Sequence, residues 1–113
     1  MGAPDMGIVT LTELADHASR ITYAAEIPMI VDVDTGFGGI HNVARTVREM
    51  ERAGVAGLHI EDQTTPKRCP ALDGRQVVSV DEAVVRIQAA LEARSNDDFI
   101  IIARCDADRK SVV

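Results

Sequence analysis

The sequence predicts an α/β fold, a partial (β/α)8 TIM barrel in which about three to four βα units share one parallel sheet. Three observations lead to this prediction. Short apolar segments rich in Val and Ile alternate with longer segments of helical periodicity. Acidic residues cluster where these apolar segments end. The chain has 113 residues, fewer than the roughly 250 of a complete barrel. We therefore treat residues 1–113 as one partial barrel domain.

The first part of the chain predicts a helix followed by a buried strand. Thr10 and Glu13 have the spacing of a capping box, and apolar residues follow at helical intervals, so we expect a helix over about 12–24. The β-branched segment Met29–Val33 follows Pro28 and precedes a glycine-rich loop, which is typical of a strand in a parallel sheet.

Two further pairs of helix and strand complete the pattern. The next helix is predicted to end at Gly54, and its apolar face consists of Val43, Val47 and Met50. A strand is expected at Gly57–Glu61. Ser79 and Glu82 repeat the capping-box spacing before another helix, whose apolar stripe consists of Ala83, Ile87, Ala90 and Leu91. The segment Phe99–Ala103 predicts the third strand, and successive strands of this kind are joined by right-handed crossovers.

Composition excludes several classes of function. The net charge of −6 and the absence of a basic cluster argue against nucleic acid as a partner. No apolar segment approaches the roughly 20 residues that span a bilayer, so we expect no membrane association. The N-terminus shows no secretory pattern, and the two cysteines form no metal knuckle or redox pair. A cytoplasmic protein with reduced thiols is expected.

Three carboxylates indicate a divalent-metal site at the carboxyl ends of the strands. Asp32 and Asp34 are two positions apart, so their side chains should point to the same side, and Glu61 ends the following strand. Such oxygen ligands favour Mg²⁺ or Mn²⁺ over zinc, although each aspartate alone would more often cap a loop or helix. His59 is expected to be a hydrogen-bonded core residue. The backbone N–H groups of Gly36, Gly38 and Gly39 could approach an anion, but loop flexibility explains these glycines equally well.

Two further side chains could take part in chemistry. Cys69 follows Lys67 and Arg68, and neighbouring cations lower the pKa of a thiol, which makes it usable as an acid, base or nucleophile. A free surface cysteine is an equal alternative. Arg104 ends the last strand and suits a bidentate carboxylate or phosphonate, although a salt bridge to Asp106 or Asp108 is the alternative. Cys105 is expected to be a packed structural thiol.

Taken together, these residues resemble the isocitrate lyase/phosphoenolpyruvate mutase superfamily, and in particular its methylisocitrate lyase-like branch. The resemblance covers nearly the whole chain through the segments Met1–Ile8, Val31–Gly38, Asn42–Val47, Gly57–Gln63, Pro66–Cys69 and Ile102–Ala107. It implies a swapped-helix barrel, usually a homotetramer, that binds Mg²⁺ and a small α-keto or α-hydroxy acid. The first strand, most of the second and the last three would then be missing, leaving unpaired edges and a half-exposed apolar face.

The resemblance also implies roles for individual residues. Asp34 would be the principal metal ligand, with Asp32 and Glu61 acting directly or through water. Asp5 matches an active-site aspartate of the family, and Arg104 matches the arginine that holds a substrate carboxylate or phosphonate.

Lys67 and Cys69 match the mobile gating loop of the family. In the lyases the cysteine is the general acid of a retro-aldol cleavage of a 2-hydroxy di- or tricarboxylate, and it protonates the enolate-like product. The family's pathways would place such an enzyme in mitochondria in a eukaryote, although no transit peptide is visible.

Two departures leave alternatives open. The lyase pattern continues with Gly-His, whereas Pro70 and Ala71 follow here, and proline has no N–H. The next segment, Leu72–Arg75, resembles the mutase and hydrolase branches, so phosphonopyruvate or oxaloacetate chemistry at the same metal is one alternative. The short chain makes an inactive fragment the other. Cys105 replaces a threonine that is usual in the family.

Overall fold

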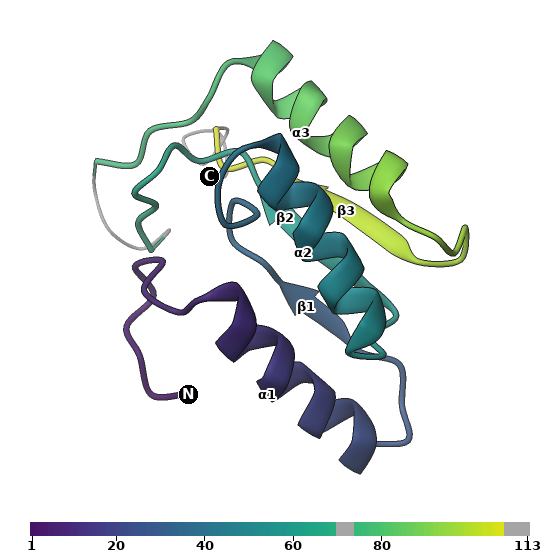
Figure 1. Cartoon of the computed structure of the whole chain (residues 1–113). Helices are drawn as coiled ribbons and strands as arrows, with labels where there is room; N and C mark the ends of the chain where they lie inside the picture. The colour runs from purple at the N-terminus through teal and green to yellow at the C-terminus, as the bar shows by residue number, and fades with distance from the viewer. Residues whose placement is uncertain (70–73, 108–113) are drawn as a thin grey trace, which may run out of the picture.

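In the part of the chain that the structure describes, three helices alternate with three parallel strands (Figure 1). The computed structural model describes residues 1–69 and 74–107. In chain order the elements are α1 (Leu11–Ala24), β1 (Ile30–Asp32), α2 (Ile40–Arg52), β2 (Gly57–Glu61), α3 (Val80–Ala93) and β3 (Ile100–Arg104). The strands lie in the order β1-β2-β3, and both pairings are parallel. The predicted α/β class and parallel sheet are therefore confirmed, with β1 shorter than expected and β3 shifted by one residue.

The helix ends follow the local sequence closely. The Thr10 side chain accepts the N–H of Glu13, and the Glu13 carboxylate accepts the N–H of Thr10, so the predicted capping box is present. Gly54 has φ 82° and ends α2, because its N–H bonds to the Glu51 carbonyl while the next N–H returns to Met50. A side chain would be strained in this left-handed conformation.

The third helix has only half of its predicted capping box. Ser79 accepts the N–H of Glu82 at 3.2 Å. The Glu82 carboxylate instead lies 3.6 Å from the guanidinium of Arg86, one turn further along the helix. An arginine four residues after the glutamate competes for its carboxylate.

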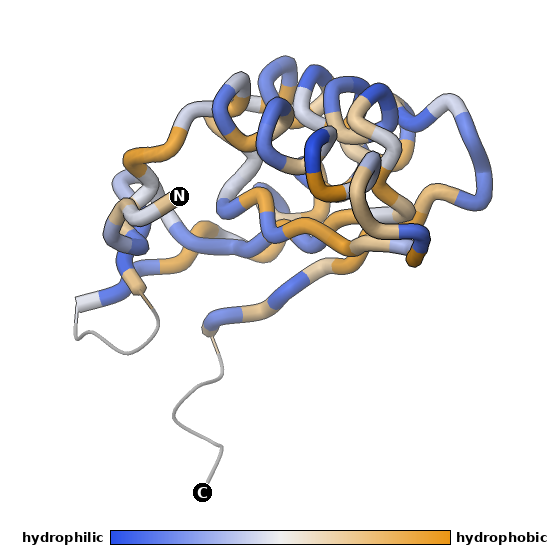
Figure 2. The backbone as a smooth tube through the Cα atoms, turned by 90° about the horizontal axis from the view of Figure 1, so that it is seen from below, coloured by the Kyte–Doolittle hydropathy of each residue, from blue (hydrophilic) through white to orange (hydrophobic). Residues whose placement is uncertain are grey.

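The hydrophobic core lies between the helices and one face of the sheet. Met50 from α2 and Leu58 from β2 are fully buried, as are Val33 and Val47. Figure 2 shows the helices on one side of the strands. Each such side chain contributes roughly 1.5–3 kcal/mol when it leaves water. The helical spacing of the apolar residues in α2 therefore predicts which face of this helix is buried.

The opposite face of the sheet is open. Ile30, Ile100 and Ile102 have 42%, 50% and 43% of their surface exposed. Within the described ranges, the outer edges of β1 and β3 pair with no other strand. These observations confirm the predicted half-exposed apolar face and its two unpaired edges. None of the helices described is long and apolar enough to cross a membrane.

Candidate active site

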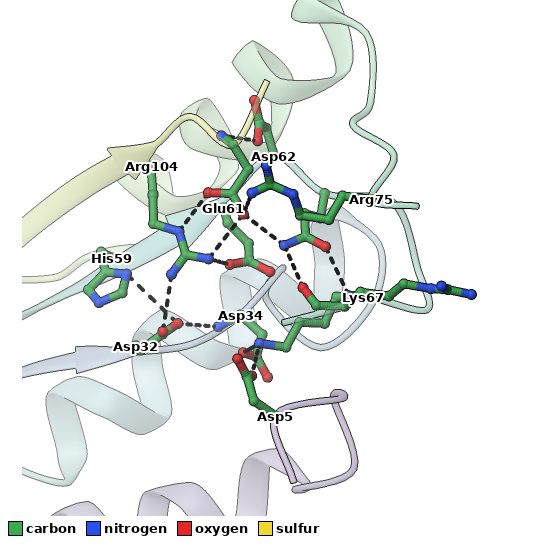
Figure 3. Close-up of polar contacts among 12 residues, drawn as sticks. Asp5, Asp32, Asp34, His59, Glu61, Asp62, Lys67, Arg75 and Arg104 are labelled. Carbon is green, nitrogen blue, oxygen red and sulfur yellow. Dashed lines mark hydrogen bonds and ion pairs between the residues drawn. The ribbon is translucent and has the colours of Figure 1, made fainter. Parts of the chain in front are cut away.

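The carboxyl ends of the three strands bring the predicted polar residues together (Figure 3). Asp32 is the register partner of His59, and Glu61 is the register partner of Arg104. Because the strands are parallel, these residues meet at one edge of the sheet, where α/β proteins place their sites. The site has two cationic centres, Arg104 and Lys67, and each lies among carboxylates.

Arg104 binds three carboxylates at once. Its Nη1 lies 3.3 Å from Asp32 Oδ2, its Nη2 pairs with Glu61 Oε2, and its Nε donates to Asp106 Oδ1 at 2.9 Å. The hydrogen bonds to Asp106 hold the pKa of Arg104 above its ordinary value, against the effect of burial, and the charge of Glu61 adds to them. Asp106, which the sequence offered only as an alternative partner for Arg104, is thus part of the centre.

Glu61 is the most deeply buried acid of the site. Its side chain has no exposed surface, and burial raises its pKa to about 7 although the charges of Arg104 and Lys67 act in the opposite direction. Its second oxygen, Oε1, is buried and has no hydrogen-bond partner in the part of the chain that the structure describes. An unsatisfied buried oxygen is costly, so this atom is available to a ligand.

The Lys67 centre joins the N-terminal segment to the loop after β2. The ammonium group pairs with Asp5 and lies 2.6 Å from Asp34 Oδ1, and the lysine side chain is only 4% exposed. Burial alone would lower the pKa of Lys67, but the hydrogen bonds to Asp34 and Asp5 outweigh it and raise the pKa. The hydrogen bond from Lys67 lowers the pKa of Asp5, and a hydrogen bond from Cys69 adds to this effect. Cys69 is half-buried and free.

Asp34 has an unusual backbone conformation. Its φ of 51° is left-handed, a region that aspartate tolerates better than most residues and that is often found at functional sites. Its N–H donates to Asp32 Oδ1 at 2.9 Å. β1 ends at Asp32, so the strand alternation that was expected to point both side chains to the same side does not extend to Asp34. Asp34 faces Lys67, whereas Asp32 faces Arg104.

The predicted metal ligands carry suitable oxygens but are paired with cations here. Among residues 1–69 and 74–107, no three His, Cys, Asp or Glu side chains are grouped closely enough to hold a metal. The donor chemistry of Asp32, Asp34 and Glu61 still fits a hard divalent cation, and the unpaired Oε1 of Glu61 is one oxygen ready to bind it. The metal site therefore stays a prediction.

Three expectations differ from the structure. The N–H of Gly36 donates to the Val33 carbonyl at 2.9 Å, and a Cβ at Gly36 would lie 2.6 Å from Val43. Packing therefore explains this glycine, and its N–H is used within the turn. His59 is half-buried, and its Nδ1 lies 3.7 Å from Asp32 without a hydrogen-bond partner among the described residues. Cys105 is exposed, because its side chain follows a strand at an open edge.

Several cavities lined by the described residues adjoin these centres. One of about 220 Å³ is lined by Asp5, Asp32 and Asp34 together with apolar residues of the N-terminal segment. A second, of about 490 Å³, has Asp34 and Lys67 in its wall, with Arg45 from α2. These volumes suit a small polar molecule. Pro70 and Ala71, which depart from the lyase pattern, lie outside the described residues, as do Leu72, Asp73 and Asp108.

Sequence reasoning missed two buried polar residues beside the site. Gln63 is 1% exposed, and its amide contacts both Asp106 and the backbone of Arg68. Arg86 is 9% exposed and donates to the Glu61 carbonyl at 2.7 Å. The alternation of His59, Glu61 and Gln63 could have placed Gln63 on the same side. No sequence signal marked Arg86.

Comparison with known proteins identifies the family. The family model of phosphoenolpyruvate phosphomutase matches residues 1–111. Isocitrate lyase of Haloferax volcanii is 54% identical over 106 residues, which are 94% of this chain and 31% of that protein. The 2-methylisocitrate lyase of Vibrio cholerae is 49% identical over 106 residues, 94% of this chain and 34% of that protein. The chain thus spans about a third of the length of these relatives.

A solved structure agrees with this result. Phosphonopyruvate hydrolase in complex with oxalate and Mg²⁺ is 35% identical, with a TM-score of 0.83 over 93% of this chain and 35% of that one. The chain belongs to the phosphoenolpyruvate mutase/isocitrate lyase superfamily, of whose barrel it represents a part.

Proposed function

We propose that this chain carries part of the active site of a Mg²⁺-dependent carbon–carbon lyase, one that cleaves a 2-hydroxy di- or tricarboxylate resembling 2-methylisocitrate. The observation that carries the proposal is the convergence of Asp5, Asp34, Lys67 and Cys69 beside the Arg104 centre. Sequence identities of 54% and 49% with two lyases support the reaction class. The chain's length, about a third of theirs, makes turnover by the isolated chain a separate question.

Asp34 would hold the metal, with Asp32 and Glu61 binding it directly or through water. The unpaired oxygen of Glu61 supports this choice, as does the Mg²⁺ in the complex of the related phosphonopyruvate hydrolase. When bound, Mg²⁺ would stabilise negative charge on the hydroxyl and carboxylate oxygens of a substrate. Mn²⁺ has similar ligand preferences and should substitute.

The remaining residues bind substrate and move a proton. Arg104 offers a planar guanidinium to a substrate carboxylate, although binding would require it to release part of its contact with Asp32. When the substrate hydroxyl loses its proton to a base, the carbon–carbon bond breaks and its electron pair passes to the carbon beside the carboxylate. The Cys69 thiol donates the proton that this carbon needs. Asp5, whose pKa is lowered by Lys67 and also by the neighbouring Cys69, would orient the thiol.

The test replaces each cysteine in turn. Cys69→Ser should lower the cleavage of 2-methylisocitrate at least about a hundredfold, since loss of a general acid usually costs this much. Cys105→Ser is the matched control, because Cys105 is exposed and outside both charged centres. The assay is release of cleavage products in the presence of Mg²⁺. Cleavage at the wild-type rate by Cys69→Ser would exclude the acid role.

Phosphonopyruvate or oxaloacetate chemistry is the second candidate. The likeness to phosphonopyruvate hydrolase favours it, because that reaction could use the same carboxylates and Arg104 without a thiol. This candidate would be supported if Cys69→Ser kept full activity on phosphonopyruvate while neither the wild type nor the variant cleaved 2-methylisocitrate. If the purified chain turns over neither substrate but binds Mg²⁺, the inactive-fragment alternative holds.

A further inference from the structure

We propose that Gln63 is a positioning residue that fastens the loop carrying Lys67 and Cys69 to the end of β3. Its side-chain amide contacts the loop on one side and Asp106 on the other. Its significance for catalysis rests on the proposed function, but the fastening itself can be measured without any substrate.

The first half of the argument is the contact with the loop. Gln63 Oε1 accepts the N–H of Arg68 at 2.9 Å, and Gln63 Nε2 donates to the carbonyl of Arg68 at 3.0 Å. One side chain therefore satisfies both backbone groups of one loop residue, as a neighbouring strand would. Lys67 and Cys69 flank Arg68, so a fixed backbone at Arg68 restricts both of these side chains.

The second half is the contact with the Arg104 centre. The same Nε2 donates to Asp106 Oδ2 at 2.7 Å, and Asp106 accepts two hydrogen bonds from Arg104. Gln63 thus links the two cationic centres through Asp106. The amide is 1% exposed, so water cannot replace these hydrogen bonds if the side chain is shortened.

The backbone of Gln63 is itself held in place. Arg86 Nη1 donates to the carbonyls of Glu61 at 2.7 Å and of Gln63 at 3.2 Å. Gln63 also forms an isolated antiparallel bridge with Val77. The amide therefore extends from a fixed base, which a residue that orients a loop requires.

The test measures the loop in the purified chain. Gln63→Met keeps the approximate length of the side chain and removes its hydrogen bonds, and Gln88→Met on the exposed face of α3 is the matched control. We expect hydrogen exchange of the Arg68 amide and alkylation of Cys69 to become at least about tenfold faster in Gln63→Met, the change that loss of about 1.4 kcal/mol produces. The rate at Cys105 should not change. Unaltered rates at Arg68 and Cys69 would overturn the proposal.

If Gln63→Met also speeds hydrogen exchange of the core amides of Leu58 and Ile60, paired substitutions at Gln63 and Asp106 keep the proposal testable. Gln63→Glu places a carboxylate against Asp106 and should speed exchange at Arg68. Adding Asp106→Asn replaces the repulsion by a hydrogen bond between the two side chains. The Arg68 amide of the double variant should therefore exchange more slowly than that of Gln63→Glu, and more slowly than the sum of the two single effects predicts. A double variant no better protected than Gln63→Glu would refute the link. Because neither readout uses substrate or metal, failure here is separate from failure of the lyase assignment.

Discussion

Replacing Lys67 with methionine should be far more damaging than the same replacement at Arg20. Both cations pair with carboxylates, but the Lys67 side chain is 4% exposed and that of Arg20 is 77% exposed. Breaking a buried pair by removing one partner costs about 3–5 kcal/mol, whereas exposed pairs contribute about 0–1 kcal/mol. The structure thus separates two chemically similar substitutions.

The magnitude for Lys67→Met should lie at the low end of the buried range. The carboxylates left behind are those of Asp34, 24% exposed, and Asp5, 51% exposed, so water can partly solvate both. We expect a loss of about 3 kcal/mol in the free energy of unfolding. With a urea dependence of about 1.5 kcal/mol per molar, the midpoint should fall by roughly 2 M.

The assay is urea unfolding followed by circular dichroism for the wild type and both variants. Arg20→Met should move the midpoint by less than about 0.7 M, since its pair with Asp16 contributes at most about 1 kcal/mol. A Lys67→Met midpoint that moves no further than that of Arg20→Met would refute the reasoning. A normal Lys67→Met midpoint together with rapid proteolysis before Leu11 would show that the lysine fastens only the N-terminal segment.

Three further predictions follow from the site and the core. Between about pH 4.5 and pH 7 the folded chain keeps a proton on Glu61 that the unfolded chain releases, so the free energy of unfolding should fall as the pH rises through this window. Glu61→Gln should remove that slope in urea titrations, and equal slopes in the two proteins would contradict it. Met50→Ala in the fully buried core should cost about 2–5 kcal/mol, against less than about 0.5 kcal/mol for Met6→Ala at the surface, as measured by thermal unfolding. Millimolar Mg²⁺ should raise the Tm of the wild type but not that of Asp34→Asn, and an unchanged wild-type Tm would count against the metal site.

The fold was predictable because its signals are local. The Thr10–Glu13 box, the glycine at 54 and the periodic face of α2 each depend on residues a few positions apart. The convergence of Asp32, Glu61 and Arg104 was predictable because parallel strands align their carboxyl ends.

The polar links between distant segments were not predictable in the same way. Whether Cys105 is buried depends on what covers β3, and the partner of Lys67 depends on where the N-terminal segment lies. Gln63 shows the same limit, because its role comes from contacts with Arg68 and Asp106 that periodicity does not encode.

The strand order bears on how the chain folds. Since β1, β2 and β3 pair in the order of the sequence, each βα unit can pack on the one already formed as the polypeptide leaves the ribosome. Ile30 pairs with Gly57 and Gly57 pairs with Ile100, so both pairings join distant parts of the chain and should form more slowly than the helices. The contacts of Arg104 and Asp106 with the end of β2 can form only after β3 has docked. The charged centres should therefore assemble late, after the helices and the first two strands are in place.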